Sequence, residues 1–165
     1  EEDPVSTKVT NTDRYQATPA QLIAMMADPD YLAEKYAALG DKSVDIIEQT
    51  ASDGALIINV ERESVNPDAL KKIGGDTSKT KQTEDWKAQG DGYAADLHID
   101  GGVVKINGKL VITAVGDSES DWAVELDIKA GVPLVGGKIE KAVAGLSKEN
   151  MAREYQFNQQ WLASH

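Results

Sequence analysis

The residues best placed to do chemistry are polar side chains that share a face with apolar rows. Arg62 continues an alternating apolar row at positions 56, 58 and 60, and Glu84 lies on the strand expected next. Residues two apart on a strand point to the same face, so both charges are expected to face inward. If the two strands are neighbours, Arg62 and Glu84 can meet there and either orient the polar group of a ligand or neutralise each other. The second strand carries its inward residues at the same spacing: Thr80, Gln82, Glu84 and Trp86.

Three functions are compatible with this polar group, and the sequence leaves all three open. The first is binding of an apolar or amphipathic small molecule without catalysis, with Arg62 and Glu84 orienting the ligand. The second is an enzyme of the cyclase or dehydratase type with Glu84 as general base beside Trp86. That reaction needs an acid partner, and the sequence shows no clear one. The third is a protein-interaction module with a filled core. We favour the first and assign no catalytic residue, while leaving open whether the chain is an enzyme.

Several other chemistries are excluded by composition. The chain has no cysteine and two histidines, which removes thiolate nucleophiles, sulfur-ligated zinc and multi-histidine metal sites. His98 shares its side of a strand with Asp96, opposite Leu97 and Ile99, so we interpret it as an outer-face residue. We therefore expect no metal and no cofactor.

Two partial motifs fail on their spacing. The glycine-rich stretch 131–138 resembles a phosphate-binding loop, but an extra Gly137 shifts the lysine and Ile139 replaces the Ser or Thr that would bind magnesium. We interpret the stretch as a hinge between the last strand and the last helix. Residues 96–107 resemble a calcium loop, but Asn107 stands where a bidentate Glu is required.

The charge of the chain limits its partners. With 17 Lys and Arg against 28 Asp and Glu among 165 residues, the formal net charge is −11. Such a surface repels phosphate backbones and anionic headgroups, so neither nucleic acid nor a membrane is expected as the main partner. No apolar run approaches the roughly 20 residues that span a bilayer, so membrane insertion is not expected. The cytoplasm is the default location, with a removed leader as an open alternative.

Periodicity predicts an α+β domain over residues 6–165, preceded by a disordered or artificial tail of residues 1–5. A first strand at a sheet edge is followed by two short helices, one capped by Thr18 with Pro19 at its first position and one opened by Asp28 or Pro29. Six antiparallel strands and one long helix complete the order. The expected strands span 6–17, 42–51, 55–65, 77–88, 93–99, 103–115 and 121–130; the helices span 18–27, 28–40 and 138–163, with one turn at 68–73.

This order predicts a cavity, because a single helix cannot close a curved sheet as flatly as a second sheet would. The sheet should contribute inward apolar residues such as Leu110 and Leu126 to the cavity wall. The long helix should contribute Val143 and Leu146, and Asn150 interrupts its apolar stripe. Together with the inward residues of the expected strands 55–65 and 77–88, these side chains form the predicted ligand-binding set: Arg62, Thr80, Gln82, Glu84, Trp86, Leu110, Leu126, Val143, Leu146 and Asn150.

Four short segments carry a resemblance to a known family. They are ADPDY at 27–31, TEDW at 83–86, VPLVGGKIE at 132–140 and QWL at 160–162. With the element order, they make the chain similar to an uncharacterised, largely actinobacterial family of the START-like, polyketide cyclase (SRPBCC) superfamily. The resemblance implies a helix-grip fold and a small hydrophobic ligand that is lipid-, sterol- or polyketide-like. It implies no activity for particular residues, and it leaves the oligomeric state open.

Overall fold

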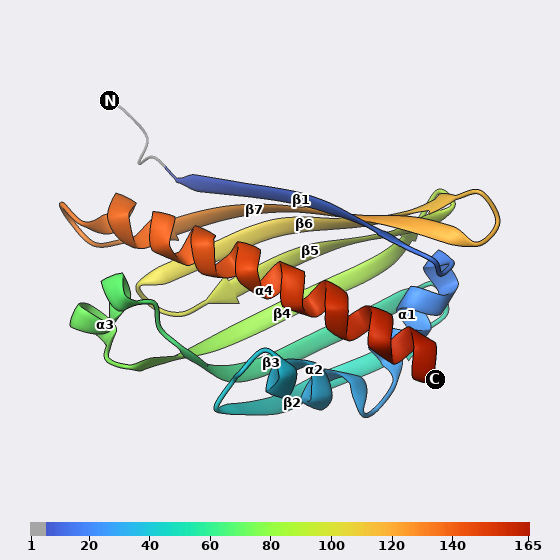
Figure 1. Cartoon of the computed structure of the whole chain (residues 1–165), viewed down its shortest axis with the longest axis horizontal. Helices are drawn as coiled ribbons and strands as arrows, with labels where there is room; N and C mark the ends of the chain where they lie inside the picture. Colours follow the sequence, from blue (N-terminus) through green and yellow to red (C-terminus); the bar gives the residue numbers. More distant parts are fainter. Residues whose placement is uncertain (1–5) are drawn as a thin grey trace.

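A computed structural model describes residues 6–165 and places one long helix across a seven-stranded sheet (Figure 1). The expectation for residues 1–5 lies outside the described residues. The strands are β1 (Thr7–Tyr15), β2 (Ser43–Ser52), β3 (Ala55–Val65), β4 (Thr77–Gln89), β5 (Gly92–Asp100), β6 (Val104–Val115) and β7 (Glu119–Ala130). The helices are α1 (Pro19–Ala27), α2 (Tyr31–Ala38), α3 (Asp68–Gly74) and α4 (Gly136–Ser164).

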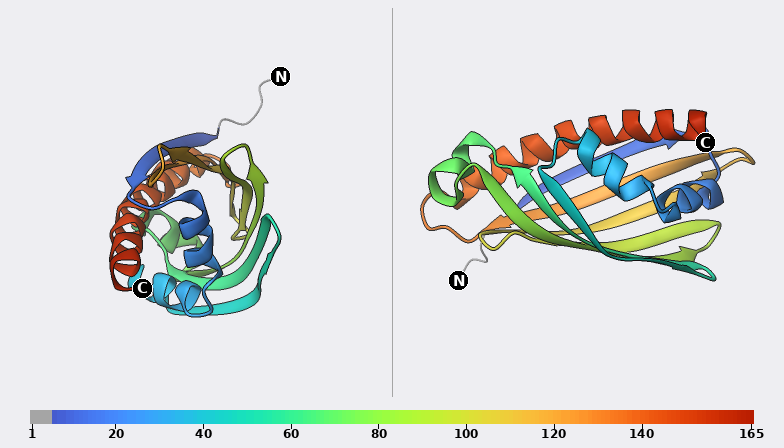
Figure 2. Two further views of the ribbon diagram at one scale, coloured as in Figure 1. Left: turned by 90° about the vertical axis from the view of Figure 1, so that its right-hand side faces the viewer. Right: turned by 90° about the horizontal axis from the view of Figure 1, so that it is seen from below.

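The sheet is antiparallel throughout and has the order β1-β7-β6-β5-β4-β3-β2. It curls so strongly that α4 lies over its open side, with α1 at one end of the curve and α3 at the other (Figure 2). Strand β1 is an edge strand, as its polar, threonine-rich sequence predicts. The predicted α+β helix-grip fold is confirmed.

The two short helices begin and end at strong local signals. The side chain of Thr18 accepts a hydrogen bond from the backbone of Gln21, and the Gln21 side chain accepts one from the backbone of Thr18, which is a complete capping box. The second helix begins at Tyr31 instead of at Asp28 or Pro29, so that prediction is wrong by two to three residues. The carboxylate of Asp28 accepts a hydrogen bond from the backbone N–H of Asp30, which holds the connection in a turn.

The register of β3 and β4 places the polar residues of the sequence on one face. Arg62 lies opposite Thr80, and Glu84 lies opposite Ile58. The two strands are neighbours, as the prediction required, and their alternate residues form the buried inner row. His98 lies on the other face, exposed, with Nδ1 2.6 Å from Oδ1 of Asn107 on β6. The prediction of an outer-face histidine is confirmed.

The predicted glycine-rich hinge is partly helical, because α4 already begins at Gly136, and this glycine lets the helix leave β7 at close range. A Cβ atom on Gly136 would lie 2.7 Å from the carbonyl oxygen of Ala130, so a larger residue would push the helix away from the strand. Helix α4 then runs the length of the sheet (Figure 1). Its buried residues range in size from Gly136 and Ala144 in the N-terminal half to Trp161 near the C-terminal end. No helix within residues 6–165 is both long and apolar enough to cross a membrane.

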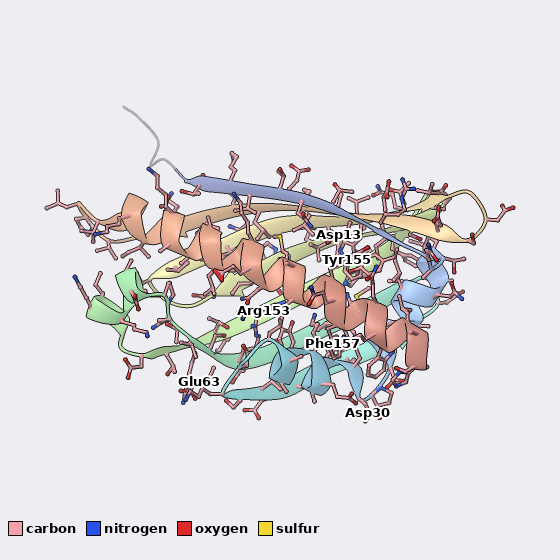
Figure 3. All side chains as sticks on the ribbon, in the orientation of Figure 1. Asp13, Asp30, Glu63, Arg153, Tyr155 and Phe157 are labelled. Carbon is pink, nitrogen blue, oxygen red and sulfur yellow. The ribbon has the colours of Figure 1, made fainter. Side chains whose placement is uncertain are left out.

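Beneath the C-terminal half of α4 the space is filled by aromatic side chains. The ring of Tyr31 packs edge-on against Trp161 with a centroid distance of 5.6 Å, and Phe157 lies beside both; Figure 3 labels Tyr155 and Phe157 on this part of the helix. Fully buried Asn158 accepts a hydrogen bond from the Tyr31 hydroxyl (2.7 Å) and lies 3.1 Å from the Tyr15 hydroxyl. Burial raises the pKa of both tyrosines, so their hydroxyl groups stay protonated.

Candidate functional site

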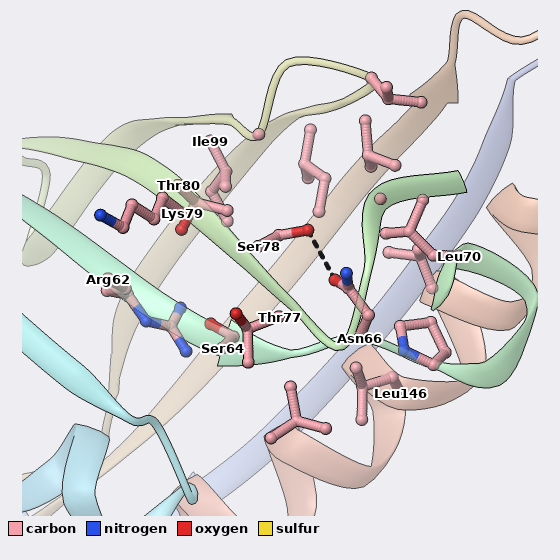
Figure 4. A pocket seen from close by; sticks show the side chains of 18 of the residues that line it. Arg62, Ser64, Asn66, Leu70, Thr77, Ser78, Lys79, Thr80, Ile99 and Leu146 are labelled. Carbon is pink, nitrogen blue, oxygen red and sulfur yellow. Dashed lines mark hydrogen bonds between the residues drawn. The ribbon is translucent and has the colours of Figure 1, made fainter. Parts of the chain in front are cut away.

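Beneath the N-terminal half and the middle of α4, space remains between helix and sheet as two neighbouring pockets, which we call the lobes of one hollow. Its outer lobe, about 360 Å³, lies where α3, the ends of β3 to β6 and α4 meet (Figure 4). Its inner lobe, about 140 Å³, lies between α2, the centre of the sheet and α4. Both lobes are bordered by Arg62, Ile99, Ser147 and Asn150, so the two pockets lie on either side of these four residues, which we call their junction.

Arg62 is held at this junction by a carboxylate from the loop after α2. Its Nε and Nη2 donate hydrogen bonds of 2.6 and 3.0 Å to the two carboxylate oxygens of Asp41. Both side chains are largely buried, with 12% and 4% of their surface exposed. The guanidinium also stacks on the ring of Tyr36, 4.1 Å from its centroid. Burial opposes the charge of Arg62, but the hydrogen bonds to Asp41 and the nearby anions raise its pKa overall.

Arg62 and Glu84 do not touch, because Gln82 lies between them. Nη1 of Arg62 donates to the amide oxygen of Gln82, and Nε2 of Gln82 donates to one carboxylate oxygen of Glu84, both at 3.0 Å. The other Glu84 oxygen accepts a hydrogen bond of 2.9 Å from Nε1 of Trp86. The alternative that Arg62 and Glu84 neutralise each other is therefore wrong: the carboxylate that pairs with Arg62 is Asp41, and Glu84 has neutral donors.

A second ion pair borders the inner lobe. Nζ of Lys35 on α2 lies 3.5 Å from a carboxylate oxygen of Glu154 on α4 and contacts the ring faces of Tyr31 and Tyr36. Burial lowers the pKa of Lys35, but the negative charge of Glu154, followed by smaller effects of Tyr31, Tyr36 and Glu84, outweighs it and raises the pKa overall. The ammonium group therefore stays charged, and its charge is matched by that of Glu154.

Several polar groups at the junction are not used by the protein itself. Thr80 Oγ1 is buried and has no hydrogen-bond partner among residues 6–165. The side chains of Ser64, Ser147 and Asn150 border the hollow and take part in none of the side-chain hydrogen bonds of the described chain. A buried polar atom without a partner is costly, as for Thr80 Oγ1. Ser64, Ser147 and Asn150 are half-buried, so their side chains can bind water or a ligand in the hollow.

The family to which the chain belongs is shown by a match to a family model that covers nearly the whole chain. Residues 10–162 match the model of a family described as a protein of unknown function, DUF2505. The chain belongs to the DUF2505 family. Comparison with curated proteins gives no match.

Solved structures of other proteins share the fold of this DUF2505 protein. One is TTHA0849 from Thermus thermophilus, with 16% identity, a TM-score of 0.67 and coverage of 96% of this chain and 100% of that one. A START superfamily protein from Mycobacterium smegmatis has 14% identity, a TM-score of 0.61 and coverage of 94% and 98%. The Zhui aromatase/cyclase from Streptomyces sp. R1128 has 12% identity, a TM-score of 0.56 and coverage of 95% and 91%. The predicted START-like relationship is thereby confirmed at the level of fold.

The structure brings together nearly all the predicted site residues of this DUF2505 protein. Trp86 is the exception: it is fully buried, borders neither lobe and acts through its hydrogen bond to Glu84. The outer lobe is bordered by Arg62, Thr80, Val143, Leu146 and Asn150. The inner lobe is bordered by Arg62, Gln82, Glu84, Leu110, Leu126 and Asn150.

Three charged residues of the site were missed by the sequence reasoning. Lys35 follows Tyr31 by four positions on the apolar face of α2, and a lysine at such a position is a signal of a buried cation. Glu154 interrupts the stripe of α4 in the same way. Asp41 follows Gly40 in what reads as an ordinary loop, and no local pattern shows that it turns back to Arg62.

Proposed function

We propose that this DUF2505 protein binds an apolar or amphipathic small molecule, of lipid-, sterol- or polyketide-like character, in the hollow beneath α4, and that it does so without catalysis. The observation that carries the proposal is the two-lobed hollow itself. Its outer lobe has a volume within the range of about 300–1,000 Å³ that is usual for small-molecule sites. Apolar walls with a few convergent polar groups are the usual lining of such sites.

The apolar wall supplies the affinity in this proposal. Leu70, Val104 and Leu146 border the outer lobe from three different elements, so a ligand there loses water on several sides. Removal of apolar surface contributes roughly 25 cal/mol per Å² before the entropic cost of binding. The unused polar groups of Thr80, Ser147 and Asn150 would fix the orientation of the ligand.

Catalysis by Glu84 is the second candidate. It is supported by the position of Glu84 on the inner lobe and by the shared fold with a protein whose name is aromatase/cyclase. Against it, both Glu84 oxygens already accept hydrogen bonds from Gln82 and Trp86. Neither histidine of the chain borders the lobes, so an acid partner of that type is not at hand.

A filled-core interaction module is the third candidate. It requires side chains to occupy the space between α4 and the sheet along the whole helix. The stretch of α4 around Phe157 and Trp161 meets that requirement, whereas the two lobes lie beneath residues 143–154 of the helix. We therefore favour the binding function.

The test is a binding titration with a neutral hydrophobic dye, Nile red, on the intact chain and on a matched pair of variants. Ser147 borders both lobes, whereas its neighbour Lys148 is exposed. Ser147→Phe should fill the junction and weaken dye binding by at least tenfold, and Lys148→Phe should leave it unchanged. Equal binding by both variants, or none by the unaltered chain, would contradict the proposal. Native mass spectrometry of gently purified protein would identify a retained compound by its mass.

A further inference from the structure

We infer that the ligand is an electrically neutral, oxygenated molecule, with carbonyl or hydroxyl groups on an apolar body, and that the hollow rejects the corresponding carboxylate. This inference rests on the proposed binding function and names the chemical class of its ligand. It follows from how the charges around the two lobes are matched.

The positive charge of Arg62 is already paired with the carboxylate of Asp41. Its bidentate hydrogen bonds to Asp41 are the geometry that guanidinium groups adopt with a carboxylate, so a second carboxylate would compete with a partner that is fixed in place. Lys35 is likewise matched by Glu154. Lys79, which also borders the outer lobe, lies on the alternate, exposed face of β4, where water screens its charge.

The charge that remains is negative. Glu84 is 5% exposed and borders the inner lobe, and the donors to its carboxylate, Gln82 and Trp86, are neutral. The charge of Lys35 also acts on Glu84, but Lys35 is shared with Glu154, so the two cations Arg62 and Lys35 face three carboxylates, those of Asp41, Glu84 and Glu154. An anionic ligand at the junction would therefore add to an excess of one negative charge among largely buried groups, where repulsion between like charges is strong. A neutral ligand avoids this repulsion.

Hydrogen bonds for neutral oxygen atoms are available at the same place. Arg62 has five N–H bonds, as every arginine does. Three of them meet Asp41 and Gln82, which leaves one hydrogen on each Nη nitrogen. The unused Thr80 hydroxyl lies on the neighbouring strand, directly opposite Arg62 in the register, and Ser147 and Asn150 border the same junction from α4. These groups can donate to carbonyl oxygens, and the hydroxyl and amide oxygens among them can accept from hydroxyl groups.

Two isosteric probes test the inference directly. 2-Naphthamide and 2-naphthoate have the same shape and differ in charge, so their dissociation constants on the intact chain, measured by calorimetry at pH 7, isolate the charge effect. We expect the amide to bind at least about tenfold more tightly, which corresponds to 1.4 kcal/mol. Equal or tighter binding of 2-naphthoate would overturn the inference and leave the proposed function intact.

Variants then identify the cause. Asp41→Asn removes the carboxylate that pairs with Arg62, and Glu84→Gln removes a buried carboxylate from the inner lobe. Each should reduce the ratio of the two dissociation constants, which we call the gap, by about fivefold or more. Asp45→Asn, which removes an exposed carboxylate from β2, is the control for net charge and should leave the gap unchanged. A gap that persists in both Asp41→Asn and Glu84→Gln would overturn the charge argument. If neither probe binds, the inference is wrong, and the Nile red titration shows whether the proposed function is wrong too.

Discussion

The two halves of α4 cover the same sheet, but side chains fill the interior near the C-terminal end of the helix and leave it hollow farther toward the N-terminal end. Beneath the C-terminal half, Phe157, Trp161 and Tyr31 fill the space with rings in edge-on and tilted contact. Beneath the middle of the helix, Ser147 and Asn150 face a hollow bordered by ion pairs. The backbone is continuous, so the size of the side chains along one helix face decides where the interior is solid and where it is open.

The packed part of the interior contributes to stability, whereas the hollow part is available for a ligand. Close packing with satisfied hydrogen bonds, as around Asn158, contributes to stability and leaves no room for a ligand. The hollow gives up packing contacts and keeps polar groups without partners, which lowers stability unless something fills the space. A domain can hold such a hollow because the other half of the same helix anchors it.

The largest expected effect is the removal of an aromatic ring from the filled half. Trp161→Ala should lower the free energy of unfolding by about 4 kcal/mol, because a cavity replaces a ring that contacts Tyr31 and Phe157. Leu146→Ala on the hollow half should cost about 1 kcal/mol, since its side chain is half-buried beside existing space. Urea unfolding of both variants measures the difference. Equal costs would show that the two halves are packed alike.

The second effect is the loss of the buried ion pair at the lobe junction. Arg62→Gln should lower the free energy of unfolding by about 3 kcal/mol, because it leaves the buried carboxylate of Asp41 without its cation. The double variant Asp41→Asn, Arg62→Gln should recover part of this loss, since no isolated charge remains. A double-mutant cycle by urea unfolding measures the recovery. Additive losses would mean that the pair is not coupled in the folded protein.

The third effect concerns the hydrogen bonds within the filled half. Asn158→Ala should cost about 2 kcal/mol, because the buried hydroxyl groups of Tyr31 and Tyr15 lose a partner. Adding Tyr31→Phe should cost little more, since it removes one of the hydroxyl groups left without a partner. Thermal unfolding of the single and double variants provides the measurement. A large additional loss on the second substitution would argue against this account.

The same contrast shows what could be predicted from the sequence. Strands and helices followed from periodicity, because alternation and the Thr18-Pro19 start are local signals. Arg62, Gln82 and Glu84 were placed inward for the same reason. The pairing of Arg62 with Asp41 could not be predicted, since it depends on how a loop after α2 folds back over the end of the sheet. Local patterns thus assign a residue to a face but do not identify its partner.

The smallest effect tests a half-buried carboxylate on β1 whose charge is coupled to that of Glu154 on α4. Asp13 on β1, labelled in Figure 3, has a raised pKa, first because burial disfavours its charge and also because Glu154 repels it, while a hydrogen bond from Asn11 opposes the shift. A carboxyl group whose pKa is higher in the folded than in the unfolded protein destabilises the fold when ionised. That cost disappears as the pH falls through the raised pKa toward the ordinary value of about 3.9.

Asp13→Asn should therefore raise the free energy of unfolding at pH 7, by less than about 1 kcal/mol because the group is partly exposed. The advantage over the unaltered chain should shrink as the pH is lowered toward about 4, because the raised pKa lets the native carboxyl group take up its proton at a higher pH than an ordinary aspartate. Urea unfolding at the two pH values measures this. Asp53→Asn in the exposed β2–β3 turn serves as the control and should change little at either pH. A stabilisation that does not depend on pH would show that the introduced amide acts through packing. The charge repulsion between Asp13 and Glu154 would then contribute nothing measurable to the free energy of unfolding.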